Sequence, residues 1–350
     1  MVALFFPFII VSEIWIAMTQ RPPILYSSFY YVALASAFGS GFFILNNFLI
    51  HLLGWPGAFS GMAALGLLDS SDMPAAGLTG FLQLAGFLAA FLLPAYMTYK
   101  LSSDGFEGHL EISEARLRKG ASYVVSFAFW SVMFVGAADA IISFMRIEGF
   151  LEPIIGKELT SNLGRSVWRG SYIHLPLMVL SAVIAARYRG NHFIWLATLI
   201  VVAELLIVVA RFIFSYEQAF MGDLVRFWYA ALFLFASAQT LIEEGHVRVD
   251  VVYASLSERT KSWVNVIGAA ALGAPLCWTI LMRGLWEKTS VINSPLLNFE
   301  TSQSGFGMYV KYLMAGFLII FAFSMLLQFS GVIMGHLRRL IGAQADNGTS

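Results

Sequence analysis

Long apolar runs separated by short polar connectors dominate this sequence. A helix needs about 20 mostly apolar residues to cross a bilayer. Nine runs come close to that length: 2–18, 27–52, 77–99, 121–145, 168–188, 194–215, 224–242, 263–286 and 310–334. They lack the period-two alternation that is typical of strands in membrane barrels. The pattern predicts an all-α, polytopic integral membrane protein with about nine transmembrane helices, within a range of eight to ten.

Two segments near the N-terminus differ from ordinary spans. Run 2–18 carries Glu13, but no basic region precedes it and no small-residue cleavage site follows it. We therefore expect a retained first helix rather than a cleaved signal peptide. The stretch 52–76 contains Trp55, Pro56, several glycines and two aspartates, which is typical of an interfacial or re-entrant segment.

Composition agrees with a lipid environment for much of the chain. The sequence is 59% hydrophobic and 12% charged, whereas a soluble domain carries about 25% charged residues. The formal net charge is +0. This balance argues against a nucleic-acid partner, which would favour a basic patch or stripe.

The distribution of lysine and arginine predicts the orientation in the membrane. Lysine and arginine are more frequent in the connectors that lie on the same side of the membrane as the C-terminus. Cytoplasmic connectors carry such an excess. We therefore expect a cytoplasmic C-terminus and an N-terminus outside. The connectors 148–169 and 284–306 then face the outside.

One connector on the cytoplasmic side has helical features. Within 104–119, Glu114 precedes Arg118 by four residues, a spacing that brings the two side chains together on a helix. The segment predicts a short amphipathic cytoplasmic helix.

A charged connector follows the seventh run. Residues 243–250 have the sequence Glu-Glu-Gly-His-Val-Arg-Val-Asp, with three carboxylates, one arginine and one histidine. Ionised groups in hydrocarbon cost several kcal/mol unless they are paired. The connector is therefore expected at the membrane surface, where a polar network can form.

Four features surround this connector in a fixed order. An earlier run ends in Val-Ala-Arg-Phe-Ile-Phe around Arg211, and Asp223 stands before the next run. The charged connector itself follows. After it, Leu-Ser-Glu-Arg ends at Arg259, and the last run contains Gly316-Phe317.

Together these features resemble the DctQ-type small membrane subunit of tripartite ATP-independent periplasmic (TRAP) transporters, over about residues 196–332. In that family, a His-x-Arg-x-Asp turn follows the second of four helices. The matching positions here are His246, Arg248 and Asp250. One departure is Met314-Ala315, where the family often has prolines.

The resemblance implies a non-catalytic scaffold subunit in the bacterial inner membrane. Such a subunit anchors a large elevator-type permease for sodium-driven uptake of organic acids, which a periplasmic solute-binding protein delivers. It also implies three parts in the chain. Residues 191–335 form a DctQ-like four-helix membrane domain, 1–190 an N-terminal extension of about five helices, and 336–350 a cytoplasmic tail.

Three charged residues inside the runs are candidates for contacts within the membrane. Arg211 either extends toward lipid headgroups or pairs with Glu217 or Asp223. Glu204 lies in the middle of its run, so we expect it to be protonated or to face a polar partner, and contact with another subunit is one option. Asp139 has small neighbours, so a hydrogen bond that packs two helices is the default expectation.

The outer connectors carry mixed charges and are candidate docking sites for the periplasmic receptor. The basic residues that we single out there are Arg146, Arg165, Arg169 and Lys288.

The sequence gives no support for a cofactor, a metal or an enzymatic activity. The six histidines form no His-x-x-x-His or Cys/His cluster. No phosphate-binding Gly-x-x-x-x-Gly-Lys-Ser/Thr motif occurs. Two alternatives to the scaffold subunit stay open: a self-contained secondary transporter or channel, which internal repeats would mark, and a membrane enzyme such as a haem-bearing subunit.

Overall fold

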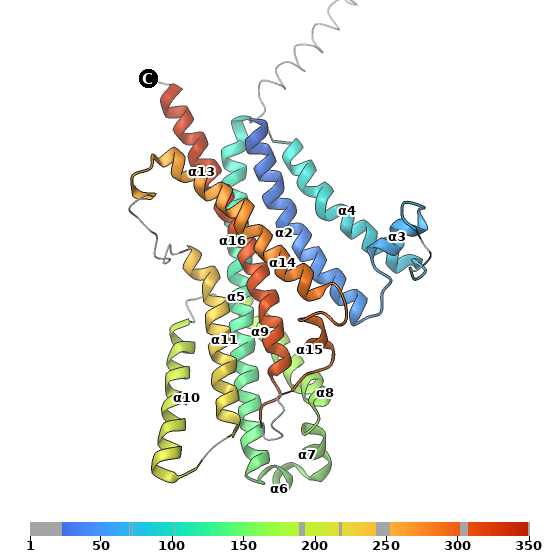
Figure 1. Ribbon diagram of the computed structural model, residues 1–350, viewed down its shortest axis with the longest axis vertical. Helices are drawn as coiled ribbons and strands as arrows, with labels where there is room; N and C mark the ends of the chain where they lie inside the picture. The colour runs from blue at the N-terminus through green and yellow to red at the C-terminus, as the bar shows by residue number, and fades with distance from the viewer. Residues whose placement is uncertain are drawn as a thin grey trace, which may run out of the picture. The chain divides into compact units, whose positions relative to one another are not determined.

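The computed structural model (Figure 1) describes residues 23–69, 71, 73–101, 103–188, 193–216, 219–242, 253–301 and 307–348. Eight helical segments in this part of the chain are long and apolar enough to cross a membrane. They confirm the prediction of an all-α polytopic membrane protein. The first predicted run, 2–18, lies outside the described residues.

The candidate spans coincide with the runs predicted from 27–52 onward. Five are formed by α2 (Ile24–His51), α4 (Gly77–Tyr99), α10 (Phe193–Phe214), α11 (Ala219–Ile242) and α16 (Lys311–Gly348). A sixth lies in α5 (Ser103–Ile147). The other two spans each contain a π-helical turn. One consists of α8 (Ser166–Arg169), η1 (Gly170–His174) and α9 (Leu175–Arg187). The other consists of α13 (Glu258–Gly268), η2 (Ala269–Gly273) and α14 (Ala274–Leu285).

Four short helices lie in the connectors. They are α3 (Ala58–Ala64), α6 (Leu151–Ile155), α7 (Lys157–Leu163) and α15 (Asn293–Leu297). At a rise of about 1.5 Å per residue, none is long enough to cross a bilayer.

The predicted separate amphipathic helix at 104–119 is wrong, because α5 is one continuous helix of 45 residues. Its expected ion pair does form: Arg118 and Glu114 approach to 3.0 Å, one turn apart. No proline stands between this segment and the following apolar run, and Gly120, which does, is helical. Nothing there interrupts the backbone hydrogen bonds, so both segments extend as one helix.

The chain divides into two compact units. One comprises residues 1–118, 247–276 and 326–350, and the other comprises 119–246 and 277–325. The first unit is called unit 1 and the second unit 2. The divisions fall inside α5, α14 and α16, so each unit combines segments from both halves of the sequence.

In unit 1, α4 packs against α2 and α3. A buried glutamine joins these elements: Gln83 Nε2 donates to Asn46 Oδ1 at 2.9 Å, and Gln83 Oε1 accepts from the Gly57 N–H at 2.9 Å. The backbones also approach closely, since a Cβ added at Gly61 would lie 2.9 Å from the Gly80 carbonyl oxygen. The connector is therefore held against α4 at Gly57, through the Gln83 side chain, and at Gly61, through close backbone contact.

Replacing Gln83 with leucine should destabilise unit 1. The Gly57 N–H and the Asn46 side chain would lose their partner in a buried place, which costs about 1–3 kcal/mol. Thermal unfolding in lipid nanodiscs and protease sensitivity of residues 52–76 would measure the effect. The matched control is Leu82→Ala, since Leu82 is exposed on the same helix. A leucine variant as stable and as protease-resistant as the parent would contradict this role.

In unit 2, the carboxyl-terminal part of α5 contacts α11 closely. Trp228 Nε1 of α11 donates to the Val132 carbonyl at 3.3 Å. A Cβ at Gly136 would lie 2.6 Å from that nitrogen. Helix α10 packs against α11. These contacts set the position of the next polar residue on α5, Asp139.

Candidate functional site

Asp139 is the centre of a buried polar cluster in unit 2. Its side chain lies on α5 in the sequence Gly-Ala-Ala-Asp-Ala and has no exposed surface. Small neighbours let other segments approach the helix at this level. The cluster comprises Asp139, Arg169, His174, Tyr309 and Tyr312, and is called the Asp139 cluster below.

Arg169 forms an ion pair with this carboxylate. Its Nη1 lies 2.8 Å from Asp139 Oδ1, and both side chains are fully buried. Arg169 Nε also donates to the Leu163 carbonyl at 2.8 Å, and Nη1 lies 3.4 Å from Ser143 Oγ. The guanidinium carbon is 4.1 Å from the centre of the Tyr309 ring. The charge is thus compensated by a carboxylate, hydrogen bonds and an aromatic face.

His174 extends the cluster toward α16. Its Nε2 lies 3.1 Å from Asp139 Oδ1, and its Nδ1 lies 2.8 Å from the Tyr312 hydroxyl. A carboxylate only accepts hydrogen bonds, so Nε2 carries a proton. In a neutral imidazole, Nδ1 then accepts from the Tyr312 hydroxyl.

The π-helical turn η1 helps to bring Arg169 and His174 to the same carboxylate. Residues five positions apart lie about 140° apart around a regular α-helix. A wider π turn has more residues per turn and reduces that offset. The same turn begins at Gly170, where a Cβ would lie 2.4 Å from the Phe299 ring. Only glycine leaves room for Phe299 at this position.

The segment before α16 is held by two carboxylates through consecutive backbone N–H groups. The Tyr309 N–H donates to Asp139 Oδ2 at 2.7 Å, and the Met308 N–H donates to Asp223 Oδ2 at 3.1 Å. The Tyr309 hydroxyl donates to the Gly164 carbonyl at 3.0 Å, and Arg146 donates to that hydroxyl. Segments from four parts of the sequence therefore meet at the Asp139 cluster and its surroundings.

The structure places the predicted site residues in different environments. Asp139 accepts hydrogen bonds from two other segments, through the Arg169 side chain and the Tyr309 backbone. Arg169, expected in an exposed outer connector, is instead fully buried, because it compensates the Asp139 charge. Arg146 is half-buried beside Tyr309. Arg165 and Lys288 are exposed.

The other predicted residues belong to the DctQ-like region. Asp223 lies 3.8 Å from Arg226, one turn along α11, and Arg211 is exposed near the end of α10. Arg259 is exposed at the start of α13. The predicted turn of His246, Arg248 and Asp250 lies outside the described residues, as does Glu217.

Glu204 is exposed in the middle of α10. A carboxylate at the centre of a bilayer costs about 3 kcal/mol on insertion scales. In the part of the chain that the structure describes, no hydrogen bond or ion pair to this side chain is present. Its environment is thus the opposite of that of Asp139, which accepts from several donors.

Sequence reasoning did not find His174, Tyr309 or Tyr312. One usable signal was that the run 168–188 contains Arg169 and His174 near its start. Charged or ionisable groups inside spans pair with one another, so Asp139 was a suitable partner for both. Nothing local marked the two tyrosines.

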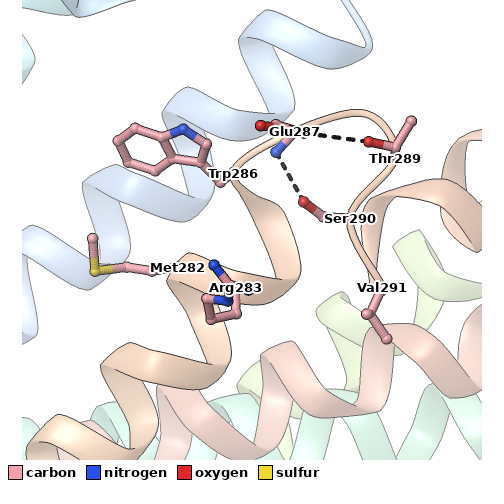
Figure 2. Close-up of a pocket in the computed structure, with 7 residues that line it drawn as sticks. All are labelled: Met282, Arg283, Trp286, Glu287, Thr289, Ser290 and Val291. Atoms are coloured by element: carbon pink, nitrogen blue, oxygen red, sulfur yellow. Dashed lines mark hydrogen bonds between the residues drawn. The ribbon is translucent and has the colours of Figure 1, made fainter.

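A second site lies on the turn after α14. A surface pocket there has a volume of about 590 Å³. Figure 2 draws the side chains that line it: Met282, Arg283, Trp286, Glu287, Thr289, Ser290 and Val291. The Glu287 N–H donates to Ser290 Oγ at 3.0 Å, which closes the turn. The pocket combines an arginine, a carboxylate and an indole ring at the end of a span. Among the described residues, no group of three or more metal-ligating side chains occurs.

The described spans and the buried polar cluster define a multi-pass α-helical membrane protein. Residues 197–339 match the family model of the tripartite ATP-independent periplasmic transporters, DctQ component. This match confirms the resemblance to the DctQ-type subunit that the sequence predicted over about residues 196–332. Comparison with curated proteins and with solved structures gave no match.

The boundary of the family match passes through the Asp139 cluster. Asp139, Arg169 and His174 precede residue 197, whereas Tyr309 and Tyr312 lie inside the matched region. The cluster thus bonds residues that precede the matched region to residues inside it.

Replacing Asp139 with alanine should strongly destabilise the protein. The variant leaves the Arg169 guanidinium buried without its counter-charge, which costs about 3–5 kcal/mol. Arg169→Ala should have a comparable effect, because it leaves the carboxylate buried. Thermal unfolding in lipid nanodiscs would measure both, with Ser143→Ala as the control because its contact with Arg169 is long.

The double variant Asp139→Leu/Arg169→Leu separates charge from packing. It leaves no buried charge, so it should be less destabilised than Asp139→Ala alone. If the free energy of unfolding of each single variant lies within about 0.5 kcal/mol of that of the parent, the ion pair does not stabilise the fold.

Proposed function

We propose that this chain is the small membrane subunit of a TRAP transporter in the bacterial inner membrane. The observation that carries the proposal is the family match over residues 197–339. In this proposal the chain is a fixed scaffold for a large permease subunit, and that permease moves substrate and sodium. A periplasmic solute-binding protein delivers the organic acid.

The form of the described spans supports a scaffold over a self-contained transporter. Substrate sites in secondary transporters are typically built from helices that are broken near the bilayer midplane. Each of the eight described spans continues as helix, two of them through a π turn. The buried Asp139 cluster is also occupied by internal bonds. Unbroken spans and an internally bonded cluster suit a subunit against which another protein slides.

Reconstitution tests the proposal directly. Proteoliposomes should contain this chain alone, the large permease alone, or both, each with and without the soluble receptor. We expect sodium-dependent uptake of the organic acid only with all three proteins. Solute accumulation by this chain alone would overturn the scaffold role and favour a self-contained transporter.

The exposed basic residues of the outer connectors are proposed to contact the receptor. Reversing Arg165 and Lys288 together, as Arg165→Glu/Lys288→Glu, should weaken docking. Exposed ion pairs contribute about 0.2–1 kcal/mol each, so loss of two pairs should raise the receptor concentration at half-maximal uptake about two- to thirtyfold. The effect should shrink as salt is added, because salt screens exposed charges.

The control for this experiment is Arg259→Glu. Arg259 is also exposed but stands on the side predicted to be cytoplasmic, so receptor dependence should not change. If the double-reversal variant shows the same uptake as the parent at every receptor concentration, Arg165 and Lys288 do not belong to the docking surface. The amount of permease that purifies with the chain should be the same for all variants.

A further inference from the structure

Helix α10 (Phe193–Phe214) has the most exposed surface of the candidate spans. Only 11% of the most apolar 18-residue stretch of this helix is buried within the protein. The mean hydropathy of 2.7 is the highest of the eight spans. The buried side chains are Leu196 and Ala203, seven residues apart on the face that packs toward α11. Within the described part of the chain, most of the remaining circumference of α10 is exposed and can face lipid or another protein.

A single carboxylic acid interrupts this surface. Glu204 is the twelfth of the 22 residues of α10 and is exposed. At about 1.5 Å per residue, it lies roughly 15 Å from either end of the helix. That distance places its carboxyl group near the middle of a hydrocarbon core about 30 Å thick. Its neighbours on the same face, Val201 and Val208, are apolar and exposed.

Lipid offers this carboxyl group no hydrogen-bond partner. The side chain is a few ångströms long and does not reach the headgroups from the midplane. Arg211, the other charged residue of α10, lies seven residues away, a rise of about 10.5 Å. Ionisable residues within spans pair with one another or line a polar path. The group that satisfies Glu204 therefore comes from outside the described part of the chain.

We propose that the Glu204 face of α10 docks against a transmembrane helix of the large permease subunit. That helix presents a hydrogen-bond donor, such as lysine, arginine, histidine or asparagine, near the bilayer midplane. The inference rests on the proposed function. A second copy of this chain fits less well, because a two-fold axis along the membrane normal would bring two like carboxyl groups together at the same depth.

The test uses the full chain, affinity-tagged and co-expressed with the permease, and purified in native-lipid nanodiscs. Glu204→Leu should reduce the permease retained by about tenfold, the loss expected when a buried polar contact is removed. Glu204→Gln, which keeps an acceptor oxygen, should retain more permease than the leucine variant. The matched control is Val183→Leu, at an exposed apolar position of α9.

A separate readout excludes simple misfolding. Without the permease, Glu204→Leu should unfold at the same temperature as the parent or higher, because it removes a polar group from an apolar face. A residue that only stabilises the fold would show the opposite change.

Photo-crosslinking locates the contact. A photoreactive residue at Val201 or Val208 should capture the permease, whereas one at Val183 should not. Capture of lipid alone or of a second copy, or normal retention by Glu204→Leu, would overturn the docking face while leaving the proposed function intact. A parent chain that retains no permease at all would overturn the proposed function and this inference with it.

Discussion

The carboxylate of Asp139 is the constraint on which the packing of unit 2 depends. It accepts from the Arg169 guanidinium, from His174 and from the Tyr309 backbone. Arg169 and His174 lie on one short segment, and the Tyr309 N–H comes from a segment more than 100 residues later in the sequence. Each alone would be expensive to bury, and the carboxylate alone more so. Because every member needs the others, the cluster fixes the mutual positions of α5, η1 and the start of α16.

This dependence links residues before the matched region to residues inside it. The matched region supplies the Tyr309 N–H and the Tyr312 hydroxyl, and α5 and η1 supply Asp139 and His174, which bond to them. These parts of α5 and η1 are therefore more than helices added beside the matched region. Unit 2 consists of segments from both sides of residue 197, so the matched region is completed by residues that precede it.

How far the sequence predicted the structure depends on the range of each interaction. The eight described spans follow from the length and apolarity of single runs, which are local properties. The bond-forming role of Asp139 followed from its place inside a span. Its partners did not, because pairing between runs depends on which helices become neighbours. Arg169 was misplaced for the same reason: as the last residue of a connector it suggested exposure, whereas its partner lies on another helix.

The two acids in candidate spans, Asp139 and Glu204, carry the same chemical group in opposite environments. Asp139 is surrounded by donors from its own chain, so its bonding capacity is used in folding. Glu204 stands among exposed valines and leucines. A carboxyl group there lowers the affinity of α10 for lipid and adds nothing to the packing of the described fold. In the docking that we propose, its energetic cost is recovered when a donor arrives from the permease, so the residue would determine partner choice rather than stability.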